Sequence, residues 1–108
     1  MFQNINPAEL VAMRERQEIT LIDVRTDAEV ARGMIGGARH IPLFSLPQHA
    51  SSLANEPAIV IYCQSGGRSA QACSYLSQQG IDGLHNLAGG ILAWVRDGNG
   101  LAGGPVNS

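Results

Sequence analysis

One segment of the sequence contains residue types that could carry out nucleophilic chemistry. An apolar run over residues 58–62 ends at Cys63, and a short loop containing glycine then leads to Arg68. A thiol that ends a buried strand and faces the start of a helix lies where a thiolate and a bound anion are both stabilised. Arg68 is the only Asp, Glu, Lys or Arg in residues 57–81, which sets it apart from ordinary surface charges.

The loop after the cysteine can stabilise this thiolate with its backbone. If it curls, the amides of residues 64–68 turn inward, and together with the start of the following helix they lower the pKa of Cys63. Gly66 and Gly67 give the backbone freedom to curl, and Arg68 can bind an oxyanion through two parallel hydrogen bonds. The predicted site therefore combines a nucleophile, Cys63, with an anion-binding loop of Gln64, Ser65, Gly66, Gly67, Arg68 and Ser69.

Each of these residues also has a simpler explanation. A cysteine at the end of a buried strand is often an inert core residue, two glycines can mark a tight turn, and Arg68 could be a solvated residue at a helix start. Their joint occurrence in a segment with one charged side chain favours the functional interpretation.

Length and composition indicate one domain, residues 1–108, with a flexible C-terminal segment at 98–108. The net charge of -2 gives no reason to expect nucleic acid or an anionic membrane as a partner, and the absence of lysine excludes a lysine nucleophile. The N-terminal residues lack the pattern of a signal peptide, and no apolar run approaches the length of a membrane span. We therefore expect a cytoplasmic protein, by default a monomer.

Short strands and helices alternate along the chain, which predicts an α/β fold with a mostly parallel five-stranded sheet and helices on both faces. In such sheets ligands bind beyond the carboxyl ends of the strands, where Cys63 lies. The predicted strands are Phe2–Ile5, Thr20–Val24, Ala38–Ile41, Ala58–Tyr62 and Leu84–Leu87. The predicted helices run from Pro7 to about Arg16, from Thr26 for a short stretch, from Ser69 to Gln79 and from Ile91 to about Asp97; Phe44 to Leu53 forms a short helix or turns, with Pro47 limiting its regularity.

The second cysteine, Cys73, is predicted to lie about a turn and a half inside the helix after the loop, beyond disulfide reach of Cys63. We expect it to pack in the core; a role as a resolving thiol is the alternative. The histidines, His40, His49 and His85, fall on predicted loops without ligand spacing, so no metal site is expected.

The sequence resembles single-domain rhodaneses over nearly its whole length. The resemblance rests on a series of motifs that occur in the same order: Leu21–Arg25, Glu29, Gly33, Ala38–Pro42, Tyr62–Ser69 and Leu87–Trp94. It implies a sulfurtransferase in which Cys63 takes a sulfane sulfur, as a persulfide, from thiosulfate or a low-molecular-weight persulfide. The acceptor would be cyanide, a thiol or a sulfur-carrier protein. Ping-pong kinetics and no cofactor are expected.

The resemblance also assigns roles to individual residues. It implies that the loop amides hold the persulfide and that Arg68 binds the anionic donor. Asp23 and Arg25 match the motif, and we expect them to form a salt bridge that supports the active-site loop.

The chain departs from the family pattern after the second predicted helix. At the positions of residues 33–38 the family commonly has Gly-His-Ile-Pro-Gly-Ala. This sequence has Met34 in place of the histidine and Gly36 in place of the proline. We expect an altered loop and altered access to the site, with no catalytic group lost. His40 stands where the family usually has asparagine, and its role is left open.

Two other functions remain as alternatives. A cysteine phosphatase of the related fold has five residues between its cysteine and arginine, whereas four separate Cys63 from Arg68, and the smaller ring favours sulfur over phosphate. A non-catalytic interaction or regulatory module is the other alternative. Such modules often lose the cysteine, which this sequence retains.

Overall fold

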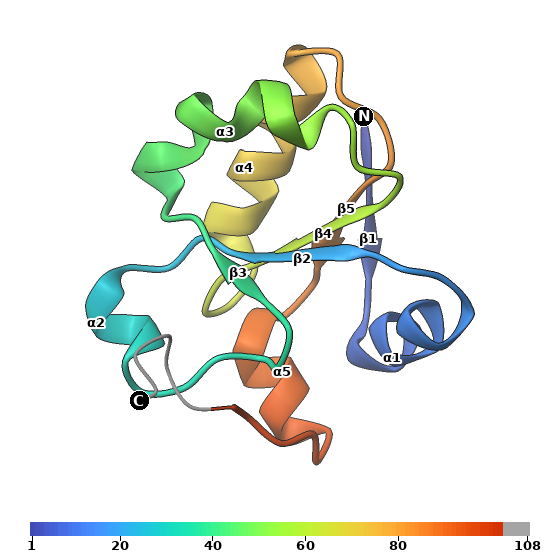
Figure 1. The fold of residues 1–108 in the computed structure, drawn as a ribbon. Helices are drawn as coiled ribbons and strands as arrows, with labels where there is room; N and C mark the ends of the chain where they lie inside the picture. The colour runs from blue at the N-terminus through green and yellow to red at the C-terminus, as the bar shows by residue number, and fades with distance from the viewer. Residues whose placement is uncertain (103–108) are drawn as a thin grey trace.

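The computed structural model describes residues 1–102, and its centre is one parallel sheet (Figure 1). All neighbouring strands are parallel, and their order across the sheet is β1-β5-β4-β2-β3. The strands are β1 (Phe2–Ile5), β2 (Thr20–Asp23), β3 (Arg39–His40), β4 (Ile59–Tyr62) and β5 (Leu84–Leu87). The helices are α1 (Pro7–Arg16), α2 (Asp27–Val30), a 3-10 turn (Leu43–Ser45), α3 (Leu46–Leu53), α4 (Gly67–Gln78) and α5 (Gly90–Arg96). The predicted α/β architecture is confirmed.

Helices cover both faces of the sheet (Figure 1). On one face α3 and α4 pack on the sheet through Leu53 and Leu76, and on the other α1 and α5 pack through Leu10 and Trp94. The central strand β4 is buried at all of its residues, as its uninterrupted apolar sequence predicts. The core therefore has two layers, and β4 is enclosed between them.

Capping residues start the first two helices as their sequences predict. The side chain of Asn6 accepts a hydrogen bond from the backbone N–H of Glu9, and the Glu9 side chain accepts one from the N–H of Asn6. Thr26 and Glu29 form the same reciprocal pair at the start of α2. This second pair fixes the Glu29 side chain near the carboxyl end of β2.

Two local predictions were wrong. Pro47 does not limit the regularity of its segment: it lies in the first turn of α3, where a missing N–H costs no helical hydrogen bond. The histidines do not lie on loops, because His40 is in β3, His49 in α3 and His85 in β5. Strand and helix ends otherwise differ from the predictions by one or two residues, as at β2, which ends one residue before Val24.

Because the strands are parallel, the loops after β2, β4 and β5 lie together at the end of the sheet where the carboxyl termini of the strands meet. Asp23, at the end of β2, lies beside Tyr62, at the end of β4. The segment after α5 returns toward this end, because Ala102 and Met34 exchange backbone hydrogen bonds of 2.7 and 3.0 Å. Within the predicted C-terminal segment 98–108, residues 103–108 lie outside the described part. No helix in residues 1–102 is long and apolar enough to cross a membrane.

Candidate active site

The Cys63 thiol lies at the carboxyl end of β4 inside a ring of hydrogen-bond donors. Its Sγ accepts hydrogen bonds from the Gly66 N–H at 3.1 Å, and from the N–H and the hydroxyl of Ser69 at 3.4 Å each. The loop therefore curls around the sulfur as expected. Its donors differ in part from those predicted, because the Ser69 amide and hydroxyl lie beyond the predicted span of residues 64–68.

These donors decide the acidity of the thiol. Burial by itself would raise the pKa of Cys63, but the hydrogen bonds from Ser69 and Gly66 outweigh it and lower the pKa below its ordinary value. A lower pKa increases the thiolate fraction at neutral pH. The site therefore holds a buried sulfur that is stabilised as an anion.

Glycine is required at two positions that shape this loop. Gly66 has a φ of +110°, a conformation that favours glycine, and this turn points its N–H at the sulfur. Gly90, at the start of α5, packs so closely on the loop that an added Cβ would collide with the carbonyls of Cys63 and Gln64. Gly67 has no such φ and is the first residue of α4, so the prediction that it supplies freedom to curl was wrong.

A second layer holds Ser69 in place. Its hydroxyl donates to Oδ1 of Asn86 at 2.5 Å and therefore shares its single proton between this oxygen and Sγ of Cys63, while the Asn86 amide donates to Oδ1 of Asn4 at 3.0 Å. Asn86 is buried in β5, the neighbour of β4. The chain thus fixes the hydroxyl that faces the Cys63 sulfur.

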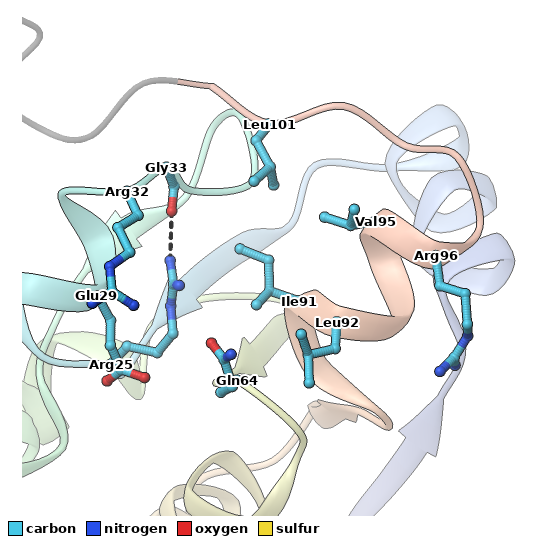
Figure 2. Close-up of a pocket in the computed structure, with 10 residues that line it drawn as sticks. All are labelled: Arg25, Glu29, Arg32, Gly33, Gln64, Ile91, Leu92, Val95, Arg96 and Leu101. Carbon is cyan, nitrogen blue, oxygen red and sulfur yellow. Dashed lines mark hydrogen bonds between the residues drawn. The ribbon is translucent and has the colours of Figure 1, made fainter.

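A cavity with a volume of about 370 Å³ opens beside the loop, between the segment around Gly33 and helix α5 (Figure 2). Gln64, the residue after the cysteine, lies at its base. Backbone hydrogen bonds join its far wall to the site: the Ile91 N–H donates to the Cys63 carbonyl at 2.9 Å, and the Leu92 N–H donates to the Gln64 carbonyl at 3.2 Å. The cavity is therefore adjacent to the backbone of the Cys63 loop, and Gln64 is the loop residue that lines it.

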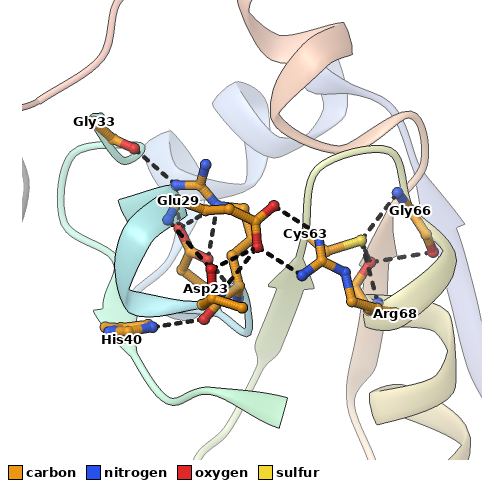
Figure 3. A network of polar contacts seen from close by, with 10 residues as sticks. Asp23, Glu29, Gly33, His40, Cys63, Gly66 and Arg68 are labelled. Carbon is orange, nitrogen blue, oxygen red and sulfur yellow. Dashed lines mark hydrogen bonds and ion pairs between the residues drawn. The ribbon is translucent and has the colours of Figure 1, made fainter. Parts of the chain in front are cut away.

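Arg68 forms an ion pair with Glu29 (Figure 3). Its two terminal nitrogens donate to the two carboxylate oxygens at 2.7 and 2.8 Å. The hydrogen bonds from Arg68, followed by those from Thr26, lower the pKa of Glu29 to about 2 although burial opposes the shift. Glu29 consequently carries its charge at neutral pH and opposes the positive charge of Arg68 near the site.

The predicted Asp23–Arg25 salt bridge is present and almost fully buried. Arg25 donates to the carboxylate through Nε and Nη2, and Nη2 also donates to the Gly33 carbonyl at 2.7 Å. The pair therefore supports the segment after α2, which forms one wall of the cavity. His40 contacts the Arg25 carbonyl through Nε2 at 2.7 Å, so this histidine belongs to the same support.

Sequence reasoning predicted the Asp23–Arg25 salt bridge, but in the described residues this pair holds the Gly33 segment and not the active-site loop that it was expected to support. Sequence reasoning also missed three contacts. It matched Glu29 to a motif without identifying it as the partner of Arg68, and it assigned no role to Asn86 or to the hydroxyl of Ser69. The isolation of Arg68 in its own segment was one available signal, since a lone partly buried cation needs a carboxylate from elsewhere. Cys73 packs in the core as predicted, and both cysteines are free.

Fold and site together define a class of protein: parallel α/β domains with an activated cysteine in the loop after a central strand. The model of the family described as "Rhodanese-like domain" matches residues 6–97. The chain therefore belongs to the rhodanese-like family.

Similar proteins agree with this assignment. The chain is 45% identical over 86 residues to a sulfurtransferase of Allochromatium vinosum, covering 80% of each chain. It is 31% identical over 93 residues to the thiosulfate sulfurtransferase GlpE of Stutzerimonas stutzeri, covering 86% of this chain and 84% of that one. A solved rhodanese-like domain protein from Staphylococcus aureus has a TM-score of 0.81 at 38% identity, covering 94% of this chain and 97% of the other. The relatives place the chain in a family of sulfurtransferases.

Proposed function

We propose that the protein is a sulfurtransferase that carries sulfane sulfur as a persulfide on Cys63. The observation that carries this proposal is the ring of donors around Sγ, from Gly66 and Ser69. The donors stabilise the thiolate that attacks the donor molecule, and they stabilise the same thiolate when it departs in the second half-reaction.

The reaction has two displacements at sulfur. With thiosulfate, the Cys63 thiolate attacks the outer sulfur, the S–S bond of thiosulfate breaks, and sulfite leaves with the electron pair. An acceptor such as cyanide then attacks the outer sulfur of the persulfide, and the electron pair returns to Sγ. Arg68 uses two of its five N–H donors for Glu29, so the remaining three are left for an anionic donor.

The spacing of the loop favours sulfur over phosphate as the transferred group. Four residues separate Cys63 from Arg68, and the hydrogen bonds from Gly66 and Ser69 converge on the sulfur itself. A non-catalytic module would have no need of these converging donors.

Intact-protein mass spectrometry after incubation with thiosulfate tests the proposal. Wild type is expected to gain one sulfur atom and to lose it as thiocyanate when cyanide is added. The variant Cys63→Ser is expected to gain none, while the control Cys73→Ala gains sulfur like wild type. Unchanged sulfur loading in Cys63→Ser, or turnover of a phosphotyrosine analogue in place of sulfur transfer, would overturn the proposal.

A further inference from the structure

The cavity beside the Cys63 loop has one apolar wall that is open to solvent. Leu92 and Val95 on α5 are 50% and 48% exposed, and Leu101 above them is 44% exposed. These three are among only five exposed large hydrophobic side chains in residues 1–102. Their gathering at one cavity beside the Cys63 loop, rather than singly over the surface, indicates a surface that contacts an apolar group.

The opposite wall carries positive charge. Arg25 is only 3% exposed, yet it donates hydrogen bonds through Nε and Nη2 alone. Every buried side-chain nitrogen or oxygen in the described part of the chain has a hydrogen-bond partner, and no described residue accepts from Nη1 of Arg25. This atom is therefore not enclosed in the core, and Figure 2 shows the guanidinium on the cavity wall, facing Ile91 across the opening.

Two further groups complete the charge of this wall. Arg32 lines the cavity and is exposed, and no residue in 1–102 forms an ion pair with it. Glu29 lies on the same wall, but it is held by Arg68. The wall thus presents to the cavity the Nη1 donor of Arg25 and the Arg32 guanidinium, neither of which has a partner among residues 1–102.

We propose that this cavity binds an organic thiol or persulfide that carries a carboxylate on an apolar chain, and that it selects this class of sulfur acceptor or donor. The carboxylate contacts Nη1 of Arg25 and the Arg32 guanidinium, and the chain lies against Leu92 and Val95. The inference rests on the proposed function. In the acceptor direction, the ligand thiolate attacks the outer sulfur of the Cys63 persulfide, the bond from that sulfur to Sγ breaks, and Sγ keeps the electron pair.

A matched pair of acceptors tests the selectivity. Mercaptohexanoate and mercaptohexanol have the same chain and similar thiols, and only the first has a carboxylate. Wild-type persulfide is expected to transfer sulfur to mercaptohexanoate with a kcat/KM about tenfold higher, as expected for a charge-assisted hydrogen bond. Arg32→Gln is expected to raise the KM for mercaptohexanoate about fivefold and to leave the kcat for this thiol unchanged. The kcat/KM for mercaptohexanol and the rate of sulfur loading from thiosulfate should also stay the same. Arg16→Gln, an exposed arginine away from the cavity, is the control and should change nothing.

Binding without chemistry separates this inference from the proposed function. Hexanoate titrated into Cys63→Ser is expected to shift the backbone amide resonances of Leu92 and Val95, and the shifts should weaken in the same variant with Arg32→Gln added. If Cys63 takes up no sulfur but hexanoate still binds, the proposed sulfurtransferase function is wrong, and the inference that the cavity binds a carboxylate on an apolar chain is supported. Equal kcat/KM for the two thiols in wild type, or no hexanoate binding in a protein that transfers sulfur, would overturn the cavity proposal.

Discussion

Cys63 and Cys73 are both buried, at 1% and 0% exposure, but the protein treats their thiols in opposite ways. The Gly66 and Ser69 amides and the Ser69 hydroxyl converge on the sulfur of Cys63, and its pKa is lowered although burial alone would raise it. Cys73 lies in an apolar cluster, and burial raises its pKa to about 12. Burial is common to both, so the difference comes from the donors.

The position of each cysteine relative to α4 explains the supply of donors. The first N–H groups of a helix have no intrahelical acceptor and can point at a nearby anion. The Ser69 amide belongs to this first turn, and it donates to the sulfur of Cys63, which lies in the segment before the helix. Cys73 is in the interior of the same helix, where N–H groups already bind carbonyls four residues earlier. The start of α4 therefore supplies a free N–H donor to the Cys63 thiol, and the interior of the helix supplies none to the Cys73 thiol.

The largest expected effect is on alkylation. Iodoacetamide reacts with thiolates, and at neutral pH a thiol with a pKa near 12 has at least about a thousandfold less thiolate than one with a pKa below 9. Peptide mapping of partly alkylated protein should therefore find label on Cys63 alone under native conditions. In denaturant the two cysteines should react at similar rates. Comparable native labelling of both would show that the donors around Cys63 do not set its reactivity.

Much of the fold could be predicted because its signals are local. The apolar run of β4 and the caps at Asn6 and Thr26 each depend on a few neighbouring residues. The position of Cys63 at the carboxyl end of a central strand, where ligands bind in parallel sheets, followed from the predicted parallel topology. The errors were also local: the sequence shows a proline at Pro47 but not that the helix starts beside it.

The missed parts of the site depend on contacts between distant segments. Glu29 and Arg68 are 39 residues apart, and Ser69 and Asn86 are 17 apart. Single-residue preferences carry no information on such pairs, because the sheet order that brings them together is a property of the whole chain. The unused donor of Arg25 could not be predicted either, since it depends on which of its nitrogens Asp23 and Gly33 occupy.

Removing one hydrogen-bond donor should raise the pKa of Cys63 toward that of Cys73. Ser69→Ala deletes the hydroxyl hydrogen bond to Sγ and leaves the two amides. A hydrogen bond to a charged group contributes about 1.5–3 kcal/mol, and because the hydroxyl also donates to Asn86 the lower end applies, so the pKa of Cys63 should rise by about one unit. The rising arm of the pH profile for sulfur loading should shift to higher pH by that amount, so that loading at any pH below both pKa values should slow about tenfold.

Ser74→Ala is the matched control, because Ser74 is exposed on the same helix. It should leave the profile in place, and circular dichroism should show both variants folded. An unshifted profile in Ser69→Ala would mean that the amides alone activate the thiol.

The smallest expected effect has the opposite sign. Glu29→Gln keeps the shape of the side chain but leaves the Arg68 charge unneutralised, and Arg68 interacts with the Cys63 thiolate. The pKa of Cys63 should fall further, by about half a unit for a charge at this range near the surface, and Cys73 should be unaffected. The pH profile should therefore shift to lower pH, whereas Glu15→Gln on the exposed side of α1 should not move it. A shift to higher pH would show that Glu29 acts by positioning Arg68 rather than by neutralising it.

The same variant has a stability effect with a defined pH window. The folded-state pKa of Glu29, about 2, lies below the ordinary value of 4.5, so the ion pair stabilises the fold above pH 4.5 and loses this contribution as the pH falls toward 2. Because the pair is partly exposed, Glu29→Gln should lower the free energy of unfolding at pH 7 by about 1 kcal/mol, or about 4–8 °C in Tm. Urea titrations of the two proteins should converge near pH 2. A difference that persists there would come from the cap at Thr26, which Glu29 also completes, and not from the charge of the pair.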